Sequence, residues 1–139
     1  MWRKITMIDL TATISQAEID AYSRSSADDG SDPVPVLIDR TAEMVRGYIR
    51  ANTAVRMSPE SFSVPDSLIS PACDYVAYEI IKRFPTKITE PRQKARDAAV
   101  ALFKDLASAK FTPESFAAEG EQPANPRQSP TYTNAPRIL

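Results

Sequence analysis

Apolar residues recur every three or four positions along two long stretches of the chain, which is the spacing of an amphipathic helix. The clearer stretch follows Asp32-Pro33, a typical N-cap and first helical residue, and continues to about Ala51. Its stripe consists of Val34, Leu37, Ile38, Thr41, Val45, Tyr48 and Ile49. We therefore expect one long helix that presents this face to a core.

The second stretch, from Leu68 to Phe84, has an apolar face so broad that it predicts the central, most buried helix of the fold. The sequence leaves two alternatives for the residue that caps the start of this helix. Either Asp66 caps it, or Ser70 does, with Pro71 as the first helical residue. Phe84-Pro85 is expected to end it, because proline cannot continue a helix.

Two further helices are predicted from their first residues. Ser15 and Glu18 have the spacing of a capping box, which predicts a short helix from about Gln16 to Arg24. Thr89-Glu90-Pro91 opens a last helix that we expect to end near Ala109 or Lys110. Residues 1–14 fit a short strand or a single helical turn, and residues 52–65 form a connection.

Residues 111–139 differ in character from the rest of the chain. They hold five of the 12 prolines, one of the 3 glycines and no apolar periodicity. Such a segment lacks the burial needed to offset its own chain entropy. The sequence thus predicts an all-α fold, a four- to five-helix bundle-like domain over residues 1–110, followed by an extended proline-rich C-terminal arm over 111–139.

Two interpretations of this arm remain open. It is either a disordered tail or an extended segment that docks on a partner and buries side chains there. The arm ends in arginine, isoleucine and leucine, which favours docking over a plain spacer. The expected partner-binding residues are Phe111, Phe116, Tyr132, Arg137, Ile138 and Leu139.

Composition weakens most catalytic and metal-binding interpretations. The chain has 139 residues, no histidine and one cysteine, so the commonest metal ligand and general base is missing. Cys73 lies on the apolar stripe of the central helix and is expected to be a small buried hydrophobe. We expect no catalytic, cofactor or metal site and no enzyme activity. No apolar run is long enough to span a bilayer or to serve as a secretory signal, so we expect a protein of a reducing cytoplasm.

The net charge of −1 gives no overall attraction to nucleic acid, but arginines and lysines cluster locally. Arg40, Arg46, Arg50 and Arg56 are interspersed with acidic residues and are expected to form a solvated, salt-bridged face. Arg92, Lys94 and Arg96 occupy the first turns of the last helix, where the helix dipole disfavours cations. This cluster is either plain surface or a face for an acidic partner or DNA phosphates.

The order of these elements and a few short phrases resemble a known family. The phrases are Val64-Pro65-Asp66-Ser67-Leu68, the stretch from Ala72 to Tyr78, and the charged stretch from Arg92 to Ala98. Over about residues 5–112 the chain is similar to the small head–tail connector, or adaptor, proteins of the neck of tailed bacteriophages, including the Mu-type virion protein family. We place no counterpart for the arm beyond Phe111.

The resemblance implies an all-α subunit of a closed ring, typically twelvefold, between the portal and the stopper or tail-completion protein. DNA would pass through the lumen as non-specific cargo, with no cofactor and no membrane contact. The protein would belong to the virion neck and be assembled in the cytoplasm of the bacterial host. The alternative from another class is a small helical DNA-binding module that contacts phosphates through Arg92, Lys94 and Arg96.

Overall fold

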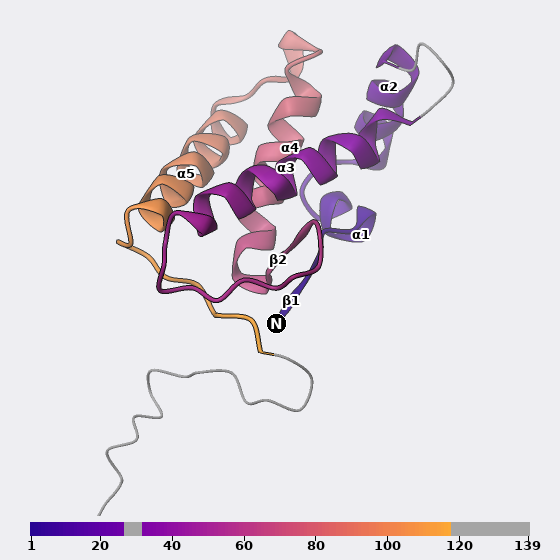
Figure 1. The fold of residues 1–139 in the computed structure, drawn as a ribbon. Coiled ribbons are helices and arrows are strands. Elements are labelled where there is room, and N and C mark those ends of the chain that lie inside the picture. Colours follow the sequence, from indigo (N-terminus) through magenta and orange to yellow (C-terminus); the bar gives the residue numbers. More distant parts are fainter. Residues whose placement is uncertain (27–31, 118–139) are drawn as a thin grey trace, which may run out of the picture.

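The computed structural model describes residues 1–26 and 32–117 and consists mainly of five helices packed together (Figure 1). The helices are α1 (Met7–Thr11), α2 (Gln16–Ser26), α3 (Pro33–Arg50), α4 (Ile69–Ile81) and α5 (Glu90–Ala107). Two short strands, β1 (Trp2–Lys4) and β2 (Ser63–Pro65), pair with each other, and two 3-10 turns, η1 (Asp66–Leu68) and η2 (Pro85–Lys87), precede α4 and α5. The predicted helical fold class is confirmed.

The core forms around α4, as its broad apolar face predicts. This helix contacts each of the other four, with α3 crossing it, α5 on one side and α1 and α2 on the other (Figure 1). Val76 and Ile80 are fully buried on α4, and Phe103 is fully buried on α5. The Phe103 ring stacks on Tyr48 of α3 with ring centroids 5.8 Å apart. Burying side chains of this size stabilises the fold by about 1.5–3 kcal/mol each.

Three of the predicted helix starts are confirmed by their caps. The backbone N–H of Val34 donates to the Asp32 carboxylate, and that of Arg92 donates to the Thr89 hydroxyl. At α2, the N–H of Glu18 donates to the Ser15 hydroxyl and the N–H of Ser15 donates to the Glu18 carboxylate. The last pair is the capping box expected from the sequence.

The start of α4 differs from both alternatives. The 3-10 turn Asp66–Leu68 leads directly into a helix that begins at Ile69, and no side chain caps it. Neither Asp66 nor Ser70 is therefore the N-cap. Pro71 lies within the first turn, where its missing N–H costs nothing because that N–H would have no helical partner.

The end of α5 also differs from the prediction, since the helix ends at Ala107 rather than near Ala109 or Lys110. Ala109 has a φ of 65° and reverses the chain direction. The N–H groups of Ala109 and Lys110 donate back to Leu106 and Asp105. This is the helix-ending motif that usually contains glycine, here built with alanine.

The small sheet is a feature that the sequence did not reveal. Trp2 pairs with Pro65 and Lys4 with Ser63 in an antiparallel register, so the expected connection 52–65 ends in a strand. The undecided N-terminal segment contains both alternatives, the strand β1 and the helix α1. Strands of three residues are too short to show an alternating pattern.

Candidate partner-binding surfaces

The described part of the predicted arm, residues 111–117, lies against the chain's own domain. The indole Nε1 of Trp2 donates a 3.0 Å hydrogen bond to the backbone carbonyl of Glu114. The N–H of Phe116 donates to the carbonyl of Arg56 at 2.7 Å, and the N–H of Arg56 donates to the Ser115 hydroxyl at 3.1 Å. Figure 1 shows this segment passing below the helices toward the N-terminus. We call residues 111–117 the arm root.

The two aromatic residues of the arm root that were predicted to bind a partner are packed partly on their own core. Phe111 and Phe116 are both half-buried against it. The Arg56 guanidinium lies 5.8 Å from the centre of the Phe116 ring, a cation–π distance. Each ring thus fixes the arm root and keeps part of its surface exposed.

Glu114 supplies the charged contact of the arm root. The Ser67 hydroxyl, just before α4, donates a 2.6 Å hydrogen bond to its carboxylate, and the Ser67 N–H donates a longer one of 3.4 Å. Burial disfavours the charged carboxylate, but the hydrogen bonds outweigh this effect and lower the pKa of Glu114. The arm root is therefore attached near β1 and η1 by polar contacts of specific geometry.

The remaining arm residues of the prediction, Tyr132, Arg137, Ile138 and Leu139, lie outside the described residues. Their partner-binding role stays a prediction.

The basic cluster at the start of α5 is engaged with carboxylates of the same chain. Arg92 donates two hydrogen bonds, of 2.7 and 2.9 Å, to Glu18 on α2. These bonds raise the pKa of Arg92, and the Arg92 guanidinium lowers the pKa of Glu18 to about 2. Lys94 pairs with Glu90 at 2.8 Å on the open surface. Arg92 thus joins the first turn of α2 to the first turn of α5.

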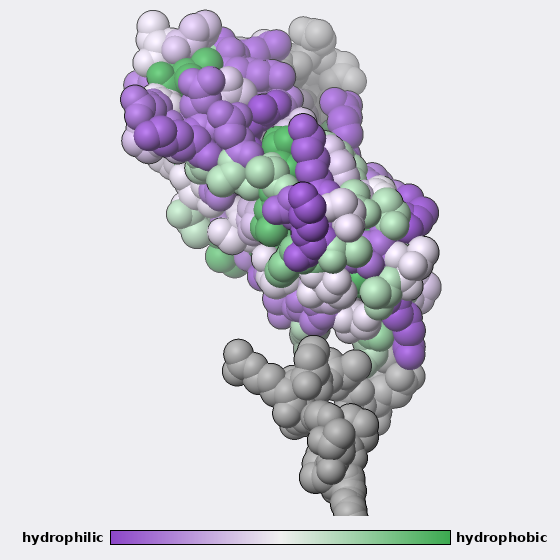
Figure 2. Space-filling model, turned by 90° about the vertical axis from the view of Figure 1, so that its left-hand side faces the viewer, coloured by the Kyte–Doolittle hydropathy of each residue, from purple (hydrophilic) through white to green (hydrophobic). Residues whose placement is uncertain are grey.

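Arg96 has a different environment, between a carboxylate and two aromatic rings. It pairs with Asp97 at 3.2 Å, and its guanidinium lies 5.8 Å from the ring centre of Tyr75 and 5.5 Å from that of Tyr78. Hydrophilic side chains gather at the end of the molecule where α5 begins (Figure 2). The predicted partner-facing role of Arg92, Lys94 and Arg96 stays a prediction.

One member of the arginine series on α3 corrects the expectation of a solvated face. Arg46 is only 8% exposed, and its guanidinium donates to the carbonyls of Ser63 and Ser58, each at 3.0 Å. Arg40, Arg50 and Arg56 are exposed, as expected. Arg46 lies three residues before Ile49 on the apolar face of α3, and this position was the sequence signal for its burial.

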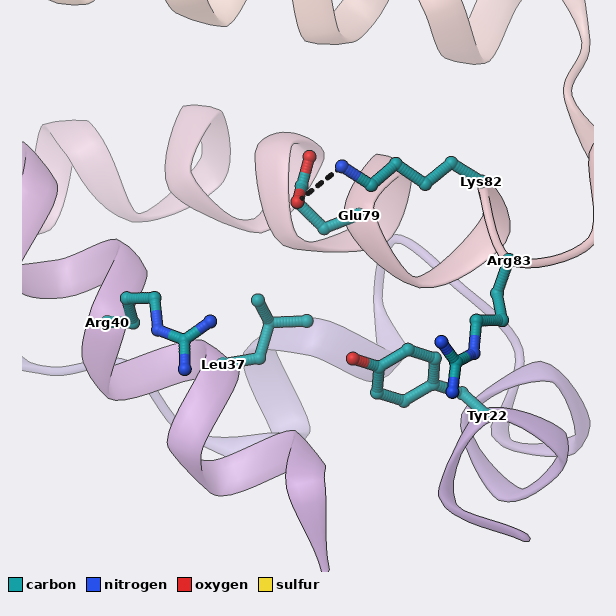
Figure 3. Close-up of a pocket in the computed structure, with 6 residues that line it drawn as sticks. All are labelled: Tyr22, Leu37, Arg40, Glu79, Lys82 and Arg83. Atoms are coloured by element: carbon teal, nitrogen blue, oxygen red, sulfur yellow. Dashed lines mark ion pairs between the residues drawn. The ribbon is translucent and has the colours of Figure 1, made fainter. Parts of the chain in front are cut away.

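A cavity of about 380 Å³ opens between α2, α3 and the end of α4, and the sequence did not predict it. Its lining residues are Tyr22, Leu37, Arg40, Glu79, Lys82 and Arg83 (Figure 3). They come from three separate parts of the chain, so no local motif marks them. We call this cavity the basic pocket.

Cys73 is buried at 1% exposure, which confirms the expected small buried hydrophobe. Burial raises the pKa of its thiol to about 12, so the thiolate needed for a nucleophile does not form near neutral pH. Within residues 1–26 and 32–117, no group of three or more acidic or cysteine side chains is placed to hold a metal ion. No helix in the same part of the chain is long and apolar enough to cross a membrane.

The fold and these surfaces define a small, mostly helical protein whose C-terminal extension is attached beside its first strand. The model of the family described as bacteriophage Mu, Gp36 matches residues 5–131. The chain belongs to this family and is therefore a phage protein. No curated protein and no solved structure matches it.

The family match confirms the Mu-type phage family that the sequence resembles, but its extent differs from our expectation. We expected the similarity to end at about residue 112, whereas the match continues to residue 131. Most of the arm therefore belongs to the sequence pattern of the family.

Proposed function

We propose that the chain is a structural virion protein, a head–tail connector (adaptor) subunit. Copies form a ring between the portal and the stopper or tail, and DNA passes through the lumen of this ring. The observation that carries the proposal is the family match to bacteriophage Mu Gp36 over residues 5–131. The protein acts in the phage neck after assembly in the host cytoplasm.

The attached arm root supports an assembly role. Contacts from Trp2, Arg56 and Ser67 hold residues 111–117 in place, so the residues that follow start from a defined point on the domain. A segment that starts from a fixed point loses less entropy when it docks than a freely moving one does. The part of the arm that follows the arm root binds the portal or the next subunit. The residues that make this contact are Tyr132, Arg137, Ile138 and Leu139.

The charge of the chain also suits a subunit that packs beside copies of itself. A net charge of −1 produces little repulsion between neighbours in a ring. Ring formation requires head-to-tail contacts whose rotation closes, and twelvefold closure is the form that we propose. The function requires no catalytic step, cofactor or metal.

A DNA-binding module is the competing function. It would use Arg92, Lys94 and Arg96, but each of these cations has a carboxylate partner in its own chain. A phosphate would have to displace that partner or share the cation with it, which favours the adaptor function. The DNA-binding module requires duplex binding that weakens steeply with salt, whereas the adaptor requires no such binding.

Sedimentation velocity with purified portal rings tests the proposal. The full chain should co-sediment with the portal, and the triple variant Tyr132→Ala/Ile138→Ala/Leu139→Ala should bind it more weakly. The matched control is Gln128→Ala/Ser129→Ala, which changes polar residues of the same arm and should bind as the native chain does. A chain that stays monomeric and leaves the sedimentation of the portal unchanged contradicts the proposal.

A further inference from the structure

The basic pocket carries a local positive charge on a chain that is slightly acidic overall. Three of its six lining residues are cations and one is a carboxylate, which leaves an excess of two positive charges. The whole chain has a net charge of −1. This excess is concentrated around a cavity of about 380 Å³ that opens to solvent.

Two of the three cations are held in place by neighbouring groups. Arg83 lies over the Tyr22 ring, 6.0 Å from its centre, and donates a 3.3 Å hydrogen bond to the Ser25 carbonyl. Lys82 pairs with Glu79 at 2.9 Å. Arg83, held in this way, loses little side-chain entropy when it binds an anion. Lys82 already has a carboxylate partner, so it is not counted among the groups that bind the ligand.

Arg40 is the cation that remains available. It is exposed on α3, and it forms no ion pair with any residue that the structure describes. Figure 3 shows its guanidinium and that of Arg83 on either side of Leu37 and the Tyr22 ring. The pocket therefore has two guanidinium groups with an apolar surface between them.

The lining favours a peptide over a nucleic acid. A phosphate backbone brings closely spaced negative charges, and Glu79 repels the charges that do not reach a guanidinium. The apolar surface of Leu37 and Tyr22 would contact nothing on such a backbone. An acidic peptide offers both partners, because a carboxylate accepts paired hydrogen bonds from a guanidinium while a neighbouring side chain supplies apolar contact.

We propose that the basic pocket binds an acidic peptide segment of a partner protein. Carboxylates of the segment pair with Arg40 and Arg83, and an adjacent apolar side chain packs on Leu37 and Tyr22. This inference is independent of the adaptor proposal, since it requires neither a ring nor a portal.

Fluorescence anisotropy on the full chain tests the inference. The probe is a short fluorescein-labelled peptide of Glu-Leu pairs separated by Gly-Ser, and the comparison peptide has glutamine in place of each glutamate. The glutamate peptide should bind, and Arg40→Glu should weaken its binding at least about tenfold. The matched control is Arg50→Glu, an exposed arginine of the same helix outside the pocket, which should change binding by less than about twofold.

Three results would each overturn the inference. The first is that the glutamate peptide does not bind, or binds no better than the glutamine peptide. The second is that Arg40→Glu and Arg50→Glu weaken binding equally, which would indicate general charge attraction. The third is that a labelled DNA duplex binds more tightly than the peptide and is lost with Arg40→Glu, which would assign the pocket to nucleic acid. Circular dichroism of both variants checks that they are folded.

Discussion

The indole Nε1 of Trp2 donates a hydrogen bond to the carbonyl of Glu114, so the first strand holds the start of the C-terminal arm. Trp2 is only 8% exposed, and its N–H would otherwise be buried without a partner. An unsatisfied buried donor costs about 1–3 kcal/mol. The arm root is therefore part of the folded domain and not a loose extension of α5.

Trp2→Phe tests this contact. The substitution removes the donor and some buried volume, so we expect a loss of about 1–3 kcal/mol in the free energy of unfolding, measured by urea titration. Hydrogen exchange of the Phe116 amide, which donates to Arg56, should accelerate more than exchange within α4. If Phe116 and α4 change equally, the contact stabilises the whole domain and does not specifically hold the arm root.

The two hydrogen bonds of the buried Arg46 guanidinium predict that lysine is a poor replacement for this residue. A lysine cannot donate to both the Ser58 and the Ser63 carbonyls from a fixed plane, so one of them loses its partner. We expect Arg46→Lys to lower the free energy of unfolding by about 2–4 kcal/mol. Arg50→Lys, an exposed change on the same helix, should stay within about 0.5 kcal/mol. If both substitutions change the free energy of unfolding equally, the two hydrogen bonds of Arg46 do not hold the loop that carries Ser58 and Ser63.

The Arg92–Glu18 pair predicts a specific pH dependence. The Arg92 guanidinium lowers the pKa of Glu18 from its ordinary 4.5 to about 2. The folded state thus favours the charged carboxylate, and this stabilisation is complete above pH 4.5 and is lost as the pH falls toward 2. Glu18→Gln should destabilise the protein at neutral pH, and the difference from the native chain should shrink on acidification through this range.

Urea titrations at several pH values measure this difference directly. Glu90→Gln is the control, because Glu90 is 77% exposed and, within residues 1–26 and 32–117, its one ion pair is with the exposed Lys94. A Glu18→Gln effect that is independent of pH would show that the carboxylate charge contributes nothing to the contact between α2 and α5.

The positive φ of Ala109 predicts that glycine stabilises this position. Ala109 has a φ of 65°, a conformation that costs an L-residue about 1 kcal/mol and glycine almost nothing. Ala109→Gly should raise the free energy of unfolding by about 0.5–1 kcal/mol. Ala107→Gly, two residues earlier and still helical, should lower it by about 1 kcal/mol. If both substitutions lower the free energy of unfolding by the same amount, the backbone at Ala109 is not strained.

Features that depend on neighbouring residues could be predicted from the sequence. The caps Ser15, Asp32 and Thr89 act within three residues of themselves, so their pattern alone identifies the helix starts. The central position of α4 follows from its broad apolar face, because such a face must be covered on several sides.

Features that depend on distant residues could not be predicted. The position of Arg46 on the apolar face of α3 is a local signal for its burial, but its hydrogen-bond partners Ser58 and Ser63 lie on a separate loop. No pattern near Arg46 predicts that this loop lies over α3. The basic pocket brings Arg40 of α3 together with Arg83, which follows the end of α4. The turn at Ala109 could not be predicted because alanine is a strong helix former, whereas glycine is the usual residue where a helix ends with a positive φ.

An electron-microscopy reconstruction of the phage neck tests the central claim most directly. The adaptor function predicts a ring between the portal and the tail, each subunit of which fits the five-helix domain with its arm on the portal or on a neighbouring copy. A reconstruction in which this position is filled by a different fold would contradict it.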